Sequence, residues 1–142
     1  MTGLRIERTL PAPPERVWRA LTEATALAAW FWPAHFATTV RIDARPGGEL
    51  RIAAANGLAV SGRFRTVEPP HRLDLTWRWD GDDEQTLVTI ELSEADGGTA
   101  LVLTHEGFAA DSTRDDHRTG WSDCLDRLPA WLIAQDTHPL WT

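Results

Sequence analysis

Residues 72–106, with the sequence RLDLTWRWDGDDEQTLVTIELSEADGGTALVLTHE, decide the fold of this chain. Apolar side chains alternate with polar ones in three runs of strand length, at about 72–79, 85–93 and 99–106. Alternation with a period of two is typical of a strand that buries one face. Turns rich in aspartate and glycine separate the runs. Because short turns of this kind join neighbouring strands, the stretch predicts an antiparallel meander.

Outward from this meander, further turn signals divide the chain at intervals of roughly ten residues. They are Pro46-Gly47-Gly48, Asn56-Gly57 and Glu68-Pro69-Pro70. Asn-Gly is a strong hairpin signal, since both residues tolerate a positive φ. Strands are therefore expected at about 38–45, 49–55 and 58–67. One more is expected at 4–10, where Leu4, Ile6 and Leu10 alternate with polar residues. The result is an antiparallel sheet of six or seven strands.

The same alternation predicts which side chains face inward, because successive residues of a strand point to opposite faces. The inward set is almost entirely apolar: Val40, Ile42, Leu50, Ile52, Leu58, Val60, Phe64, Leu73, Leu75, Trp77, Trp79, Val88, Ile90, Leu92, Leu101, Leu103 and His105. The opposite face carries charged residues such as Arg41, Arg63, Asp74 and Glu91. A sheet with one apolar face must be covered on that face.

Helical segments near both ends of the sequence supply this cover. Pro13-Pro14-Glu15 places proline in a first helical turn, and an apolar face of Val17, Trp18 and Leu21 follows at helical spacing. A second short helix is expected from Thr25 to Phe31. It is expected to end there because Pro33 cannot continue a helix. Two short helices after the first strand place the chain in the α+β class.

The longest helix is expected from about Ser112 to Leu132, with Asp111 or Ser112 as its N-cap. Its apolar stripe consists of Trp121, Leu125, Leu128 and Leu132. Pro129 falls inside this pattern. Because proline removes one backbone hydrogen bond, we expect a kink or break near Leu125 to Leu128.

The composition is that of one ordinary globular domain spanning residues 1–142, with 42% hydrophobic and 25% charged residues. The formal charge of -7 and the lack of an arginine run argue against nucleic acid as a partner. No membrane span and no secretory signal are recognisable, so a cytoplasmic location is expected. All 14 basic residues are arginine, which excludes Schiff-base chemistry on a lysine side chain.

Three motifs occur in a distinctive order: PAPPERVWRALT at 11–22, AWFWP at 29–33 and HRTGW at 117–121. Together with Leu125 and Leu128 they resemble the family of homologues of the activator of heat-shock protein 90 ATPase. That family belongs to the START and birch-pollen-allergen superfamily. The resemblance extends from about Ile6 to Leu132. It implies a helix-grip fold, in which a curved antiparallel sheet wraps around a long C-terminal helix, with a ligand cavity between them.

We expect this cavity to be lined by the inward face of the sheet and by the last helix. The candidate ligand-binding residues are Phe64, Trp77, Trp79, Leu103, His105, His117, Trp121, Cys124 and Leu125, with Trp30, Trp32 and His35 near the entrance. Walls of this kind suit a small apolar or aromatic ligand. The alternative is that the aromatic side chains pack on one another and leave no cavity.

His105 is the candidate catalytic residue. An imidazole among apolar groups has a lowered pKa and stays neutral, which suits a general base. An enzyme of cyclase, dehydratase or hydrolase type in the same cavity is therefore an alternative to a binding protein, although a histidine satisfied by backbone or solvent explains His105 as well. His117 lies one turn before Trp121, so both histidines are expected to approach one cavity. Gly120 predicts a close approach of this helix to the sheet.

Cys124 is interpreted as a small buried hydrophobe rather than a nucleophile, because no motif supplies a base for it. The five histidines are dispersed, and no Cys-x-x-Cys or His-x-x-x-His pair occurs, so no metal is predicted. Neither a phosphate loop nor a dinucleotide fingerprint is present, so no cofactor is predicted. A third reading is an interaction module with a chaperone partner. Nothing here matches the additional N-terminal domain that the eukaryotic co-chaperones carry.

Overall fold

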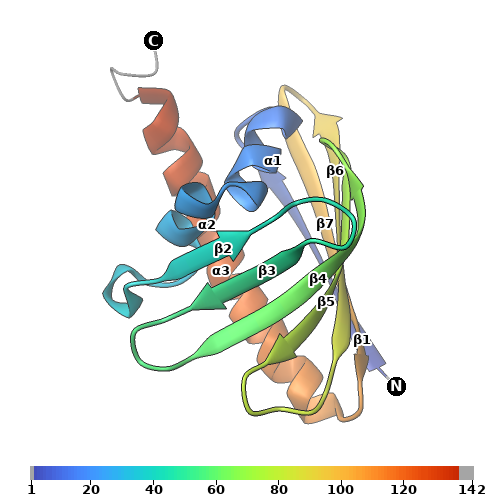
Figure 1. Ribbon diagram of the computed structural model, residues 1–142. Coiled ribbons are helices and arrows are strands. Elements are labelled where there is room, and N and C mark those ends of the chain that lie inside the picture. The colour runs from blue at the N-terminus through green and yellow to red at the C-terminus, as the bar shows by residue number, and fades with distance from the viewer. Residues whose placement is uncertain (1, 138–142) are drawn as a thin grey trace.

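The computed structural model describes residues 2–137 as a curved sheet that packs against one long helix and two short ones (Figure 1). The strands are β1 (Thr2–Leu10), β2 (Thr39–Ile42), β3 (Glu49–Ala53), β4 (Ala59–Glu68), β5 (Arg72–Trp79), β6 (Thr86–Ala95) and β7 (Gly98–Phe108). The helices are α1 (Pro14–Thr22), α2 (Ala24–Trp30), the 3₁₀ turn η1 (Ala34–Phe36) and α3 (Asp111–Thr137). The α+β class, the seven strands and the two short helices after the first strand are confirmed.

The sheet is a meander extended by the N-terminal strand. Its order is β1-β7-β6-β5-β4-β3-β2, and neighbouring strands are antiparallel throughout. In this register Leu4 of β1 lies opposite His105 of β7, and Val88 of β6 lies on the other side of His105. The imidazole is therefore in the middle of three paired strands, where its side chain faces the interior.

The sheet bends around its inner face at β4. The register between β4 and β5 shifts between Phe64 and Thr66, and a bulge of this kind bends a strand and increases its twist. Gly62 precedes the bulge, and a Cβ atom there would collide with the carbonyl oxygen of Thr76. Only glycine therefore lets the two strands approach so closely at this point. The bend turns the inner face toward α3.

The long helix α3 lies along the inner side of the sheet, and α2 packs against α3 and β2. Leu125, Leu128 and Leu132 are at most 1% exposed. The helix starts at Asp111 and continues through Pro129 to Thr137, so of the predicted kink or break, the break is wrong. The physical reason is that the apolar stripe stays in phase on both sides of Pro129. Burial of three leucines stabilises the helix by more than one missing backbone hydrogen bond costs.

One inward assignment of the sheet, Leu58, is also wrong. The side chain is 40% exposed because it belongs to the turn, and β4 begins only at Ala59. The backbone N–H of Leu58 donates to Oδ1 of Asn56 at 2.9 Å. This local bond includes Leu58 in the turn, which is therefore one residue longer than predicted. From Val60 onward the alternation holds, since Val60 and Phe64 are buried.

Candidate functional site

A cavity of about 260 Å³ opens to solvent between β5, α3 and the segment that follows α2. We call it the outer cavity, and its lining consists of Phe31, Trp32, Trp77, Trp79, Asp116, His117, Gly120, Trp121 and Cys124. Six of these belong to the predicted site: Trp32, Trp77, Trp79, His117, Trp121 and Cys124. Alternation along β5 places two of the tryptophans on one face, and spacings of three and four along α3 place the helical residues on another.

The walls of the outer cavity are aromatic rings that contact one another. Trp32 and Trp79 stack with a centroid distance of 6.2 Å and an interplanar angle of 20°. Trp77 and Trp121 face each other across the sheet–helix boundary at 5.0 Å. Phe31 meets Trp121 edge-on at 5.8 Å. Flat walls of this kind offer a large apolar contact area to a flat ligand.

Behind these rings the interior is nearly filled. A second hollow, which we call the inner void, measures only about 40 Å³, and it shares Phe31, Trp77 and Trp121 with the outer cavity. These three rings therefore form a partition between the two spaces. The predicted site residues Trp30, Phe64, Leu103 and Leu125 line the inner void and not the outer cavity. Both sequence interpretations thus hold in different places: the aromatic core is packed, and a cavity lies beside it.

Two residues expected at the entrance lie elsewhere. Trp30 is 2% exposed, and its indole N–H donates to the carbonyl oxygen of Ala20 at 3.0 Å, so it is a core residue. His35 is exposed on η1, where its ring contacts Phe36, and it does not line the outer cavity. Of the three residues expected at the entrance, only Trp32 lines the outer cavity.

Arg127 of α3 fixes the segment that carries Phe31 and Trp32. Its guanidinium donates to the carbonyl oxygens of Trp30 at 3.1 Å and Phe31 at 2.6 Å, and to Asp123 at 2.6 Å. These carbonyls end α2, where a cation also interacts favourably with the helix dipole. This contact is not predictable from local sequence patterns, because it joins residues almost a hundred positions apart.

His105 is fully buried and both of its ring nitrogens are engaged. Nε1 of Trp121 donates to Nδ1 at 3.0 Å, and an indole nitrogen can only donate, so Nδ1 carries no proton. Nε2 therefore carries the ring proton and donates to Oγ1 of Thr86 at 2.6 Å, which donates in turn to the carbonyl oxygen of Trp77. Burial, together with the nearby His117, lowers the pKa of His105 to about 3.

His117 forms a second pair of the same kind at the wall of the outer cavity. Nε1 of Trp79 donates to its Nε2 at 2.8 Å, and its Nδ1 donates to the carbonyl oxygen of Thr113 at 2.8 Å. The ring lies 5.1 Å from that of His105, with Phe108 packed against both. The two rings therefore meet, but only His117 lines the outer cavity and His105 lines neither space, so the expectation that both histidines approach one cavity is wrong. Each holds a tryptophan in place, and neither has a lone pair left to accept a proton.

Cys124 lies in the wall of the outer cavity and is 4% exposed. Burial raises the pKa of its thiol to about 12, although the charge of Arg127 acts in the opposite direction. A thiol that stays protonated is a poor nucleophile, so the side chain acts as an apolar wall.

Three lining residues were not predicted, namely Phe31, Asp116 and Gly120, although Phe31 and Gly120 belong to the motifs AWFWP and HRTGW. The close approach predicted at Gly120 is wrong, since a Cβ atom there would have no heavy atom within 4 Å. The absent side chain instead leaves space in the outer cavity. Asp116 is the charged residue of the lining. Among residues 2–137, no group of three or more His, Cys, Asp and Glu side chains is placed to hold a metal ion.

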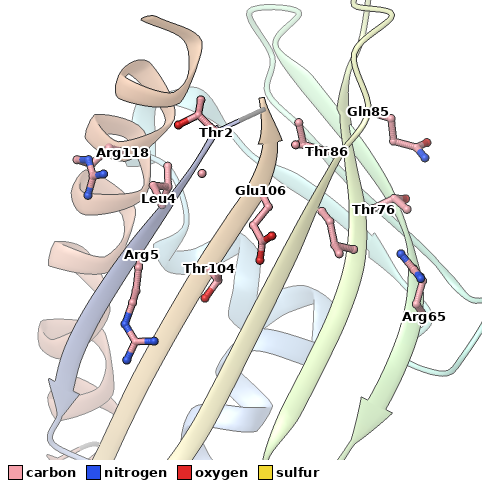
Figure 2. Close-up of a pocket in the computed structure, with 13 residues that line it drawn as sticks. Thr2, Leu4, Arg5, Arg65, Thr76, Gln85, Thr86, Thr104, Glu106 and Arg118 are labelled. Carbon is pink, nitrogen blue, oxygen red and sulfur yellow. The ribbon is translucent and has the colours of Figure 1, made fainter. Parts of the chain in front are cut away.

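A larger hollow of about 780 Å³ lies on the outer face of the sheet (Figure 2). Most of its lining residues are polar, and they come from several elements, among them Arg5 on β1, Glu106 on β7, Arg65 on β4 and Arg118 on α3. A broad polar surface of this kind is what solvent favours on the uncovered face of a sheet. The outer cavity is smaller but apolar and walled on three sides, so it is the better candidate for a ligand site.

Known proteins with similar sequence and structure agree with this fold. The model of the family described as activator of Hsp90 ATPase homolog 1-like protein matches residues 11–132. A solved structure from Chromobacterium violaceum is 34% identical with a TM-score of 0.81, over 92% of this chain and 96% of that one. An AHSA1 protein from Silicibacter pomeroyi is 26% identical with a TM-score of 0.77, over 94% and 99%.

A third structure shows the fold alone. It is described as an Hsp90 activator from Plasmodium falciparum, and it is 22% identical with a TM-score of 0.72, over 89% of this chain and 92% of that one. No curated protein matches the sequence. Within residues 2–137, no helix has the length and apolarity that crossing a membrane requires.

Proposed function

This chain belongs to the family of activator of Hsp90 ATPase homolog 1-like proteins, and on that basis we propose that it binds a small, largely apolar or aromatic molecule in the outer cavity. The observation that carries the proposal is an aromatic cavity left open beside a core that is otherwise nearly filled. The opening leaves aromatic surface in contact with water, and a bound apolar molecule would remove that surface from water. We place this binding in the cytoplasm, where the lone thiol of Cys124 stays reduced.

The size and chemistry of the outer cavity define the ligand. Its volume of about 260 Å³ is just below the roughly 300–1,000 Å³ of sites for drug-sized molecules, which favours a compound of one or two rings. Burying about 150–250 Å² of a flat apolar surface contributes roughly 4–6 kcal/mol of transfer free energy. Part of this is offset by the lost freedom of the ligand, so apolar contact alone gives weak binding, and polar contacts must add to it for a ligand to be retained during purification.

Native mass spectrometry of the purified protein tests the proposal first. We expect a retained small molecule, which extraction then identifies by its chemical class. For an empty preparation, tryptophan emission is recorded during titration with a panel of aromatic and fatty compounds. Four indoles line the outer cavity, so a bound ligand changes the emission. A preparation that is empty and responds to no compound contradicts the proposal.

Gly120 provides a matched pair of variants for this titration. A leucine at this position projects into open space in the outer cavity, so Gly120→Leu is expected to abolish binding without a steric clash in the core. Gly120→Ala adds one methyl group and stabilises the helix by about 1 kcal/mol, with binding largely preserved. Both variants are checked for folding by circular dichroism. Binding that survives Gly120→Leu places the ligand elsewhere.

Acid–base catalysis is not part of the proposal, because both histidine rings near the outer cavity have both nitrogens engaged in hydrogen bonds. A chaperone partner is not part of it either. The outer cavity has the size of a small molecule. A stable interface between two proteins needs a much larger contact area.

A further inference from the structure

The indole N–H of Trp77 is buried and has no hydrogen-bond partner among the residues that the structure describes. The side chain is 4% exposed and lies in the partition between the outer cavity and the inner void. Its neighbours differ in this respect, since Trp79 donates to His117 and Trp121 donates to His105. Trp77 thus has a donor that the folded chain leaves unused.

An unused buried donor is costly, and most buried polar atoms in proteins have a partner. The rings of Trp121 and Phe31 lie 5.0 and 6.4 Å from that of Trp77, but the face of a ring is only a weak acceptor. An oxygen atom that reaches the N–H would replace this weak contact with a full hydrogen bond. Building on the proposed function, we infer that the ligand is an aromatic molecule with a neutral acceptor oxygen, to which Trp77 donates.

The charges at the outer cavity determine which kind of oxygen fits. Asp116 lines the outer cavity, and no arginine contributes to its lining. The nearby Arg127 already binds Asp123 and the carbonyl oxygens that end α2. A carboxylate ligand would lose its hydration without gaining a cation, and it would face the negative charge of Asp116. The carbonyl oxygen of an aromatic ketone, quinone or lactone carries no such penalty.

In this inference the ligand reaches the donor by displacing the ring of Phe31. Of the three rings in the partition, Phe31 has no polar atom to hold it, whereas Trp121 is bonded to His105. Space lies on both sides of the Phe31 ring, with the outer cavity in front and the inner void behind. A ligand that enters the outer cavity displaces this ring toward the inner void and brings its oxygen to Nε1 of Trp77.

Three probes of equal ring size test the inference: 1-indanone, indane and indane-1-carboxylate. The first two differ by a carbonyl group in place of a methylene group. We expect 1-indanone to bind about tenfold more tightly than indane, and the carboxylate to bind more weakly than either. In ¹H–¹⁵N spectra, the Trp77 indole proton is expected to move downfield with 1-indanone and not with indane. Its signal is identified by its loss in Trp77→Phe.

The variants separate the hydrogen bond from packing. In Trp77→Phe the preference for 1-indanone over indane is expected to disappear, whereas the control Trp32→Phe weakens both probes and keeps the preference. Equal binding of 1-indanone and indane to the unaltered protein overturns the inference while the proposed function stands. Failure of all three probes, with an empty preparation and no response to the wider panel, overturns both. The comparison on the unaltered protein decides the matter even if Trp77→Phe fails to fold.

Discussion

At the scale of the residue, the neutral ring of His105 makes folding sensitive to acid. The unfolded chain takes up a proton here near pH 6.5, whereas the folded pKa is about 3. Between about pH 3 and pH 6.5 the imidazole is protonated in the unfolded chain only, so protonation favours unfolding. The contribution of His105 to the free energy of unfolding is therefore full above pH 6.5 and is lost as the pH falls toward 3. By urea denaturation, we expect this residue to lower the free energy of unfolding by about 2 kcal/mol between roughly pH 7.5 and pH 5.

His105→Gln is the control for this prediction, because a glutamine amide accepts and donates hydrogen bonds without titrating. The variant is expected to be less stable at neutral pH but to show a flatter pH dependence. All other side chains are the same in the two proteins, so a difference in slope comes from the change at position 105. An identical slope in the two proteins would show that His105 is not the source.

Cys124 is expected to resist thiol reagents in the folded protein. Its pKa of about 12 leaves so little thiolate at ~pH 8 that labelling is slower than for a free thiol by roughly a thousandfold. Absorbance during reaction with a disulfide reagent measures the rate, and denaturant is expected to restore the full reactivity of one thiol per chain. Rapid labelling of the native protein would be inconsistent with a buried, protonated side chain.

The residues of the site were predictable where one element sets the pattern. Alternation along β5 identified Trp77 and Trp79, and helical spacing identified Trp121 and Cys124. The protonation states were not predictable in this way. The tautomer of His105 is set by donors and acceptors on β6 and α3, which only the folded chain brings together.

At the scale of the element, Pro129 is a local defect that packing tolerates. Pro129→Ala restores a backbone N–H inside α3, where the preceding turn offers a carbonyl oxygen. We expect the free energy of unfolding to rise by about 1–3 kcal/mol, measured by urea denaturation. Loss of stability in the variant would mean that the proline ring makes packing contacts worth more than the restored hydrogen bond.

Elements were predictable where local rules and packing agree. The turn signals placed six strands and the alternation at 4–10 placed the seventh, and the bounds differ by a few residues. Local rules failed at Pro129, because the leucine stripe on α3 outweighs one lost hydrogen bond. They failed again at Leu58, because a side-chain bond from Asn56 extends the turn.

At the scale of the whole molecule, the resemblance in sequence correctly implied a sheet that grips a helix, and the alternating faces predicted which sides meet. The division of the interior into two spaces was not predictable. It depends on Phe31, Trp77 and Trp121, which come from three separate parts of the chain and meet only in the folded protein. The predicted set therefore merged the wall of the outer cavity with the lining of the inner void.

The inner void gives the molecule a measurable response to hydrostatic pressure. Unfolding eliminates its 40 Å³, which corresponds to about 25 mL/mol and favours the unfolded chain under compression. A ligand that moves Phe31 into this space makes the folded state less compressible. We expect 1-indanone to reduce the volume change of unfolding, as followed by tryptophan emission under pressure. An unchanged volume change of unfolding would mean that the ligand stays in the outer cavity. Pressure therefore distinguishes a ligand that stays in the outer cavity from one that moves Phe31 into the inner void.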